Sequence, residues 1–160
     1  MRLNRGFTLI EALVAAVIVA ILATTGILLL HRYRHMYVFQ QYASELEINV
    51  RRAKILAMER STNIGVCVSG NRVEIRDIGT QRGAGICSGN VISSINVSPS
   101  DDFISFTGSG FSFDPRGFAI FSGNACVQNT KGNNFLLICV SRFGGIRTQK
   151  GTGPCPQKCT

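Results

Sequence analysis

Glu11 is the residue whose type and surroundings most directly suggest a chemical role. It is the one charged side chain in an otherwise apolar run, residues 7–30. As a helix, about 24 residues are long enough to cross a hydrocarbon core of roughly 30 Å. A carboxylate inside such a span costs on the order of 2.5–3.5 kcal/mol, so an acid retained there is a functional candidate.

Two ordinary interpretations of this segment fit it incompletely. A secretory signal has an apolar region of about 7–15 residues and a small-residue cleavage site after it, but this run is longer and has no such site before His31. A plain membrane anchor would explain the length of the run but not the presence of Glu11 in it. Because Arg2 and Arg5 precede the run, we expect the leader on the cytoplasmic side and the rest of the chain outside.

Cysteine is the second residue type that predicts chemistry. An even number of cysteines on the exported side of a membrane indicates disulfides, and six cysteines allow 15 pairings. The spacing favours Cys155 with Cys159, and Cys126 with Cys139 across two adjacent strands, which leaves Cys67 with Cys87. A zinc site is disfavoured because the sequence has no CxxC pair and no His beyond residue 35.

The combinations of side chains that catalysis needs are missing from the sequence. The two histidines, His31 and His35, lie at the edge of the apolar run. Asp101 and Asp102 are adjacent, and neighbours on a strand point to opposite faces. Ser109 lacks the Gly-x-Ser-x-Gly pattern, and no phosphate-binding Gly-Lys-Ser/Thr sequence occurs. We therefore expect no enzyme, no cofactor and no metal site.

The remaining sequence predicts one modest domain built on a helix and strands. Apolar residues recur at spacings of three and four, so the helix is expected to continue over residues 31–60; they are Val38, Tyr42, Leu46, Val50, Ala53 and Ala57. Short alternating runs separated by Gly, Asn, Ser and Pro predict an antiparallel β-sheet head over residues 61–147. These runs are 64–68, 72–76, 92–97, 103–106, 111–113, 118–121 and 135–140. The expected fold class is α+β, a long N-terminal helix packed on the sheet.

The order of residues at the N-terminus resembles that of type IV prepilins. These proteins have a short basic leader that ends in Gly, followed by Phe and, four residues later, Glu; here these are Gly6, Phe7 and Glu11. The resemblance implies that a prepilin peptidase removes residues 1–6 and that the new amine of Phe7 is N-methylated. It also implies that Glu11 of one subunit pairs with the Phe7 amine of a neighbour and so sets the register of a filament. Pairing removes the cost of an isolated charge in apolar surroundings.

Looser motifs in the head narrow this resemblance to the GspH/FimT class of minor pilins and pseudopilins. They lie in residues 51–57, 113–118 and 141–147. The class implies a type IV pilin-like fold and a low-abundance subunit that helps to start a type IV pilus, with other pilin subunits as partners through the N-terminal helix. It also implies an inner-membrane protein, spanning once over residues 7–30 with its head in the periplasm, that later enters a pilus or pseudopilus. A type II secretion pseudopilin is an alternative that the sequence leaves open.

The basic C-terminal end leaves a second alternative, DNA binding. Some members of the class resemble DNA receptors for natural transformation and carry Gly-Arg-x-Arg after the last strand; here Gly145 replaces the first Arg. Residues 148–160 form the expected disulfide-closed basic tail, and the candidate phosphate contacts are Arg142, Arg147, Lys150 and Lys158. The net charge of +8, or +6 without Arg2 and Arg5, fits an acidic partner but is also common in soluble outer-face domains.

Overall fold

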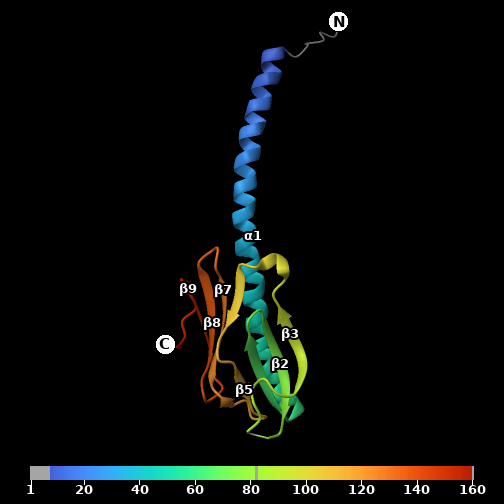
Figure 1. Cartoon of the computed structure of the whole chain (residues 1–160), viewed down its shortest axis with the longest axis vertical. Helices are drawn as coiled ribbons and strands as arrows, with labels where there is room; N and C mark the ends of the chain where they lie inside the picture. Colours follow the sequence, from blue (N-terminus) through green and yellow to red (C-terminus); the bar gives the residue numbers. More distant parts are fainter. Residues whose placement is uncertain (1–7, 82, 160) are drawn as a thin grey trace. The chain divides into compact units, whose positions relative to one another are not determined.

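The computed structural model describes residues 8–81 and 83–159, without the side chains of residues 25, 27–29, 31 and 32. Contacts divide the chain into two units, Met1–Met36 and Tyr37–Thr160. One helix, α1, runs from Leu9 to Arg60 (Figure 1). The leader, residues 1–6, and Phe7 lie outside the described residues.

In the first unit, α1 carries large apolar side chains that are exposed on all sides of the helix. They are Leu9, Ile10, Leu13, Val14, Val17, Ile18, Val19, Ile21, Leu22 and Leu30. Among the residues that the structure describes, no helix reaches the length and apolar character needed to cross a membrane. The span expected over residues 7–30 is thus not confirmed.

In the second unit, the last part of α1 packs one face against the head. The expected apolar stripe is confirmed: Tyr42, Leu46, Val50, Ala53 and Ala57 are all buried, and Val38 is half-buried against the same core. The small side chains of Ala53 and Ala57 let the strands lie close to the helix backbone. The helix ends at Arg60, and Ser61 takes a left-handed conformation with φ 53°, a common way to terminate a helix.

The head contains two antiparallel sheets where the sequence predicts one. The five-stranded sheet has the order β3-β2-β1-β5-β6. Its strands are β1 (Asn63–Ser69), β2 (Arg72–Gly79), β3 (Asn90–Asn96), β5 (Phe111–Phe113) and β6 (Ala119–Phe121). The four-stranded sheet has the order β4-β7-β8-β9. Its strands are β4 (Ile104–Thr107), β7 (Gly123–Asn129), β8 (Asn134–Val140) and β9 (Ile146–Thr152).

Both sheets share one core with α1 (Figure 1). The five-stranded sheet contributes Phe111 and Phe113, whose rings pack edge to face, with centroids 5.7 Å apart. The four-stranded sheet contributes Ile138 from β8, and Phe106 from β4 packs edge-on against Tyr42 of α1. A short 3₁₀ turn, η1 (Pro99–Asp101), precedes β4. The head is therefore α+β, as expected, with the helix as the element that both sheets contact.

All six cysteines form disulfides, but two of the three expected pairings are wrong. Cys67 pairs with Cys87, as expected. Cys126 pairs with Cys155 and Cys139 with Cys159, with Cα–Cα distances of 6.2 and 5.9 Å. The register of β7 and β8 places Cys126 opposite Leu137, not opposite Cys139. The two cysteines are thus diagonal neighbours, about 7–8 Å apart, which is beyond the usual reach of a disulfide.

The two C-terminal disulfides hold the tail on the outer face of the four-stranded sheet. There Cys126, Phe135 and Leu137 form a small second core, against which Cys139 and Cys155 pack. The Asn124 side-chain amide also donates to the Gln157 carbonyl oxygen at 3.0 Å. The tail that the sequence places at residues 148–160 begins later, because β9 continues to Thr152.

Candidate functional site

Glu11 lies in the first turn of α1, where it closes the end of the helix with Thr8. The Glu11 amide donates to the Thr8 hydroxyl oxygen at 3.4 Å, and that hydroxyl donates to the Glu11 carboxylate at 3.3 Å. The Thr8 amide also donates to the same carboxylate oxygen, at 3.5 Å. These contacts form a capping box, in which Thr8 is the N-cap and Glu11 the third helical residue.

The capping box gives Glu11 a role within its own chain that our sequence interpretation missed. The signal is present, because Thr8-Leu9-Ile10-Glu11 fits the Ser/Thr-x-x-Glu pattern of such boxes. The helix dipole favours a negative charge in this turn, and the side chain is exposed. Gly6 and Phe7, the expected sites of cleavage and methylation, lie outside the described residues.

The second candidate site is the set of basic residues near the C-terminus, and the structure brings three of the four together. Arg142 and Lys158 line one groove beside the Cys139–Cys159 disulfide. Arg147 lines an adjoining groove that reaches Cys139 and Cys159 from the β9 side. Neither groove is lined by Asp or Glu. The disulfide thus holds the segment that contains Lys158 near the two arginines. We call these three residues the basic cluster.

Lys150, the fourth predicted residue, does not join the basic cluster. In the β8–β9 pairing, Arg147 is opposite Cys139 and Lys150 is opposite Leu136. Cys139 and Leu136 are three residues apart, and side chains alternate between the two faces of a strand. Lys150 therefore belongs to the opposite face of β9 from Arg147.

Two glycines of this region, Gly144 and Gly151, lie closely against other parts of the head. Gly144 has φ 71°, and a Cβ there would collide with the Gly117 carbonyl oxygen. A Cβ on Gly151 would lie 2.7 Å from the Phe135 ring. Both positions therefore need glycine because another part of the head lies against them.

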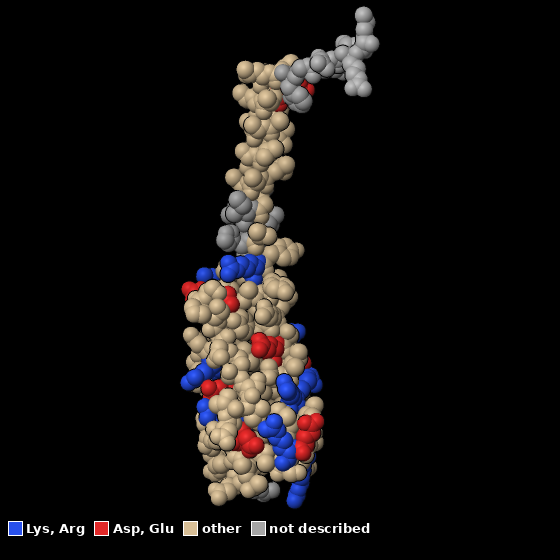
Figure 2. Space-filling model, turned by 90° about the vertical axis from the view of Figure 1, so that its right-hand side faces the viewer, with Lys and Arg blue, Asp and Glu red and all other residues tan. Residues whose placement is uncertain are grey.

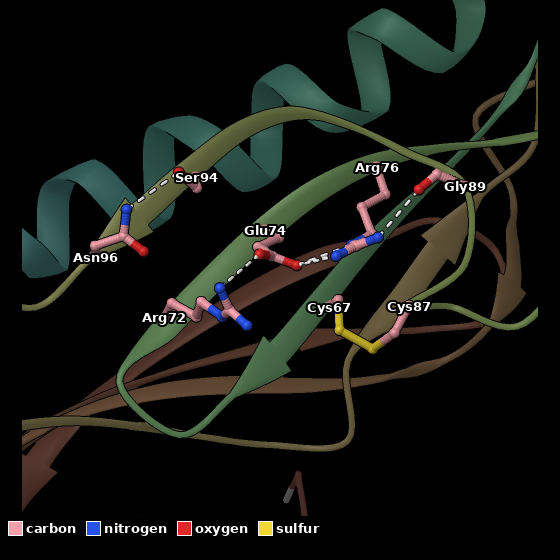
Figure 3. Close-up of polar contacts among 8 residues, drawn as sticks. All are labelled: Cys67, Arg72, Glu74, Arg76, Cys87, Gly89, Ser94 and Asn96. Atoms are coloured by element: carbon pink, nitrogen blue, oxygen red, sulfur yellow. Dashed lines mark hydrogen bonds and ion pairs between the residues drawn. A yellow bond between two sulfur atoms is a disulfide. The ribbon is translucent and has the colours of Figure 1, made fainter.

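A further group of charged side chains lies on the outer face of β2, where the sequence gave no functional prediction. Glu74 is nearly buried and lies between Arg72, at 3.4 Å, and Arg76, at 2.6 Å (Figure 3). Arg76 also donates to the Gly89 carbonyl oxygen at 3.0 Å. This contact and the Cys67–Cys87 disulfide tie the loop after β2 to the sheet. The ion pairs are thus part of the structural support of the head.

Charges of both signs are interspersed on the face of the head that Figure 2 shows, which is the side of β3 in Figure 1. Lys and Arg side chains lie there next to Asp and Glu. A nucleic-acid interface would present mainly positive charge. The basic cluster on the four-stranded sheet is thus a better candidate than this face.

Comparison of the sequence with known protein families gives a match at the N-terminus. Residues 1–27 match the prokaryotic N-terminal methylation motif. No curated protein is significantly similar in sequence.

Two crystal forms of the type IV minor pilin FimU from Pseudomonas aeruginosa resemble the structure. In space group P21, FimU has a TM-score of 0.51 at 15% identity, over 69% of this chain and 87% of FimU. In space group P65, the TM-score is 0.50 at 13% identity, over 69% of this chain and 91% of FimU. At this level of identity the likeness shows the fold.

The motif match depends on the sequence, and the fold likeness depends on the structure. The motif describes the N-terminus that contains Glu11, and the fold likeness describes a helix packed on antiparallel sheets. The N-terminus thus matches the prokaryotic N-terminal methylation motif, and the fold is similar to that of the type IV minor pilin FimU.

Proposed function

We propose that this chain is a minor subunit of a type IV pilus, of the GspH/FimT class, that helps to start or cap the filament. The observation that carries the proposal is the N-terminal methylation motif, joined to a head with the fold of a minor pilin. The disulfides add support, because they form in the oxidising compartments outside the cytoplasm.

In this proposal a prepilin peptidase cleaves between Gly6 and Phe7 and the Phe7 amine is methylated. The N-terminal part of the mature chain anchors it in the inner membrane, with its head in the periplasm, until it joins other pilin subunits. Small side chains along this part of α1 allow other helices to approach closely; they are Ala12, Ala15, Ala16, Ala20 and Ala23.

Glu11 then has two successive partners. In the single subunit its carboxylate accepts hydrogen bonds from Thr8. In the filament it pairs with the Phe7 amine of a neighbour, since a shift by one turn would strand both charges in apolar surroundings. The capping box keeps the carboxylate at the helix start, where that amine would arrive.

The test compares two acid-to-leucine variants on the same helix. Glu11→Leu should accumulate in the membrane but be absent from sheared pili, while Glu59→Leu should enter pili normally because Glu59 is exposed near the other end of α1. The measurement is an immunoblot of membrane and pilus fractions from a deletion strain that expresses each variant. Incorporation of Glu11→Leu at the wild-type level would refute the register role.

A second candidate function, DNA binding, is favoured by the basic cluster of Arg142, Arg147 and Lys158. Contacts from these side chains would be directed to phosphates and would weaken steeply with salt. In gel shifts of the full chain in detergent, Arg147→Ala should lower the salt slope by about 1. Lys150→Ala is the matched variant on the opposite face of β9 and should not change it. The absence of a shift at low salt would end this proposal.

A further inference from the structure

Two turns at the end of the head where α1 terminates are locked against each other. The first, residues 114–118, joins β5 to β6, and the second, residues 141–145, joins β8 to β9. The Ala119 amide donates to the Arg142 carbonyl oxygen at 3.2 Å, and the Lys54 ammonium of α1 donates to the Gly144 carbonyl oxygen at 2.9 Å. The close approach of Gly144 to Gly117 fixes their separation.

Each turn is also closed by its own hydrogen bonds. The Asp114 carboxylate accepts from the amides of Arg116 and Phe118, both at 2.9 Å. Ser141 and Gly145 exchange two hydrogen bonds: the Ser141 amide donates to the Gly145 carbonyl oxygen at 3.0 Å, and the Gly145 amide to the Ser141 hydroxyl oxygen at 3.1 Å. The backbone of both turns is therefore held in place before any partner arrives.

This rigid region exposes aromatic side chains to an unusual degree. Phe143 is 83% exposed and Phe118 47%. Phe121, on β6, is 39% exposed, whereas most other described phenylalanines of the head are buried; these are Phe103, Phe106, Phe111, Phe113 and Phe135. An exposed ring on a preorganised turn can be buried by a partner at little cost in conformational entropy.

The two rings border a groove that also carries positive charge. Arg116 and Arg142 line it together with Phe118 and Phe143. The single acidic residue in its lining, Asp114, is buried, and its carboxylate is engaged by the backbone of its own turn. Aromatic residues and Arg are the types enriched at the centres of protein interfaces. We call this site the aromatic–basic groove.

We propose that the aromatic–basic groove docks the head of a different pilus subunit, through a surface that bears an apolar side chain beside acidic residues. This inference depends on the proposed role as a pilus subunit. The exposed charges of the groove are the guanidinium groups of Arg116 and Arg142. Charge complementarity therefore favours a partner surface that carries acidic side chains. In a two-fold contact with a second copy through this same groove, one positively charged patch would face another.

Protein is favoured over nucleic acid as the occupant because of the shape and lining of the groove. Binding to a single strand needs a series of stacking rings along a basic track, but the groove has two rings and the Asp114 carboxylate in its wall. A protein side chain needs only one pocket with flanking cations.

The experiment places a photo-crosslinking benzoylphenylalanine at position 143 of the full chain, in cells that assemble pili. The matched control carries the same group at Val91, an exposed residue of β3. We expect position 143 to yield a crosslink, identified by mass spectrometry, to a different pilin-like chain at a peptide that contains Asp or Glu. Adding Arg116→Glu should lower the yield by about tenfold, while Arg52→Glu, on an exposed position of α1, should leave it unchanged.

Three results would overturn the proposal: a crosslink to a second copy of this chain, a crosslink to nucleic acid, or a yield no higher than that from Val91. Failure of the pilus role has a separate signature. In that case the chain itself is missing from sheared pili, whatever its crosslinks. Because Phe143 and Arg116 are exposed, these variants are expected to fold, and their thermal unfolding is compared with that of the wild type.

Discussion

At the scale of single residues, the Glu11 side chain has two roles. It caps its own helix together with Thr8, and in our proposal it also pairs with a neighbouring subunit. The hydrogen bonds of the capping box satisfy backbone donors that the first turn of any helix leaves unpaired. The same carboxylate is exposed and available to a cation from outside. An acid at this position thus has hydrogen bonds within its own chain before any filament partner is present.

Ser112, on β5, is a second residue whose environment leads to a prediction, in this case about stability. It is fully buried, and its hydroxyl has no hydrogen-bond partner among the described residues. A buried polar group without a partner costs about 1–3 kcal/mol. Ser112→Ala should therefore raise the free energy of unfolding by about 1 kcal/mol, measured by chemical denaturation. Ser122→Ala, on the exposed segment before β7, is the control; a destabilised Ser112→Ala would show that the hydroxyl has a partner.

At the scale of elements, one phenol connects α1 to the segment before β4. The Tyr42 hydroxyl donates to the Asp101 carboxylate at 3.2 Å and accepts from the Ser98 amide at 3.0 Å. Burial raises the pKa of Tyr42 above its ordinary value of 10.0, and the nearby charge of Asp101 raises it further. The phenol is therefore protonated at neutral pH and can donate to Asp101.

Tyr42→Phe should lower the free energy of unfolding by about 1–3 kcal/mol, because Asp101 and Ser98 lose their shared partner. Tyr37→Phe is the matched variant on the same helix, and it should have little effect because Tyr37 is exposed. A raised pKa in the folded state means that the contribution of Tyr42 is complete below pH 10 and is lost as the pH rises through that pKa. The difference between wild type and Tyr42→Phe should thus shrink in alkaline denaturation series; a constant difference would contradict this account.

At the scale of the whole molecule, the two C-terminal disulfides join the tail to the sheet. Each closes a long loop, with sequence separations of 29 and 20 residues, and such bridges are worth about 3 kcal/mol each. The double variant Cys139→Ser with Cys159→Ser should lower stability by that amount and separate Lys158 from Arg142. Unfolding of the variant and peptide mapping of the wild type provide the measurements. Peptides that link Cys155 to Cys159 would contradict the pairing.

The features that could be predicted from the sequence are those that depend on local patterns. The apolar spacing from Tyr42 to Ala57 predicts the buried face of α1, and Thr8 to Glu11 contains the capping signal. The features that escaped prediction depend on residues far apart in the chain. The cysteine pairing depends on the register of β7 and β8, which neither cysteine reveals by its spacing.

Strand composition explains the elements that were missed. The β9 strand, residues 146–152, lies at the edge of its sheet, and five of its seven residues are exposed. Its sequence is therefore mostly polar and resembles that of a tail. The β7 sequence begins with Gly123-Asn124, which is typical of a turn. The aromatic–basic groove was not predictable either, because it requires two turns about 27 residues apart to meet.

The position of Cys159 has a consequence for the order of events in the life of this protein. It follows β9 and bonds to Cys139 in β8, 20 residues earlier. This bridge can therefore close only after β8, β9 and the segment after them have all reached an oxidising compartment. A chain cut between β8 and Cys159 would leave Cys139 without its partner, as a free thiol on the four-stranded sheet.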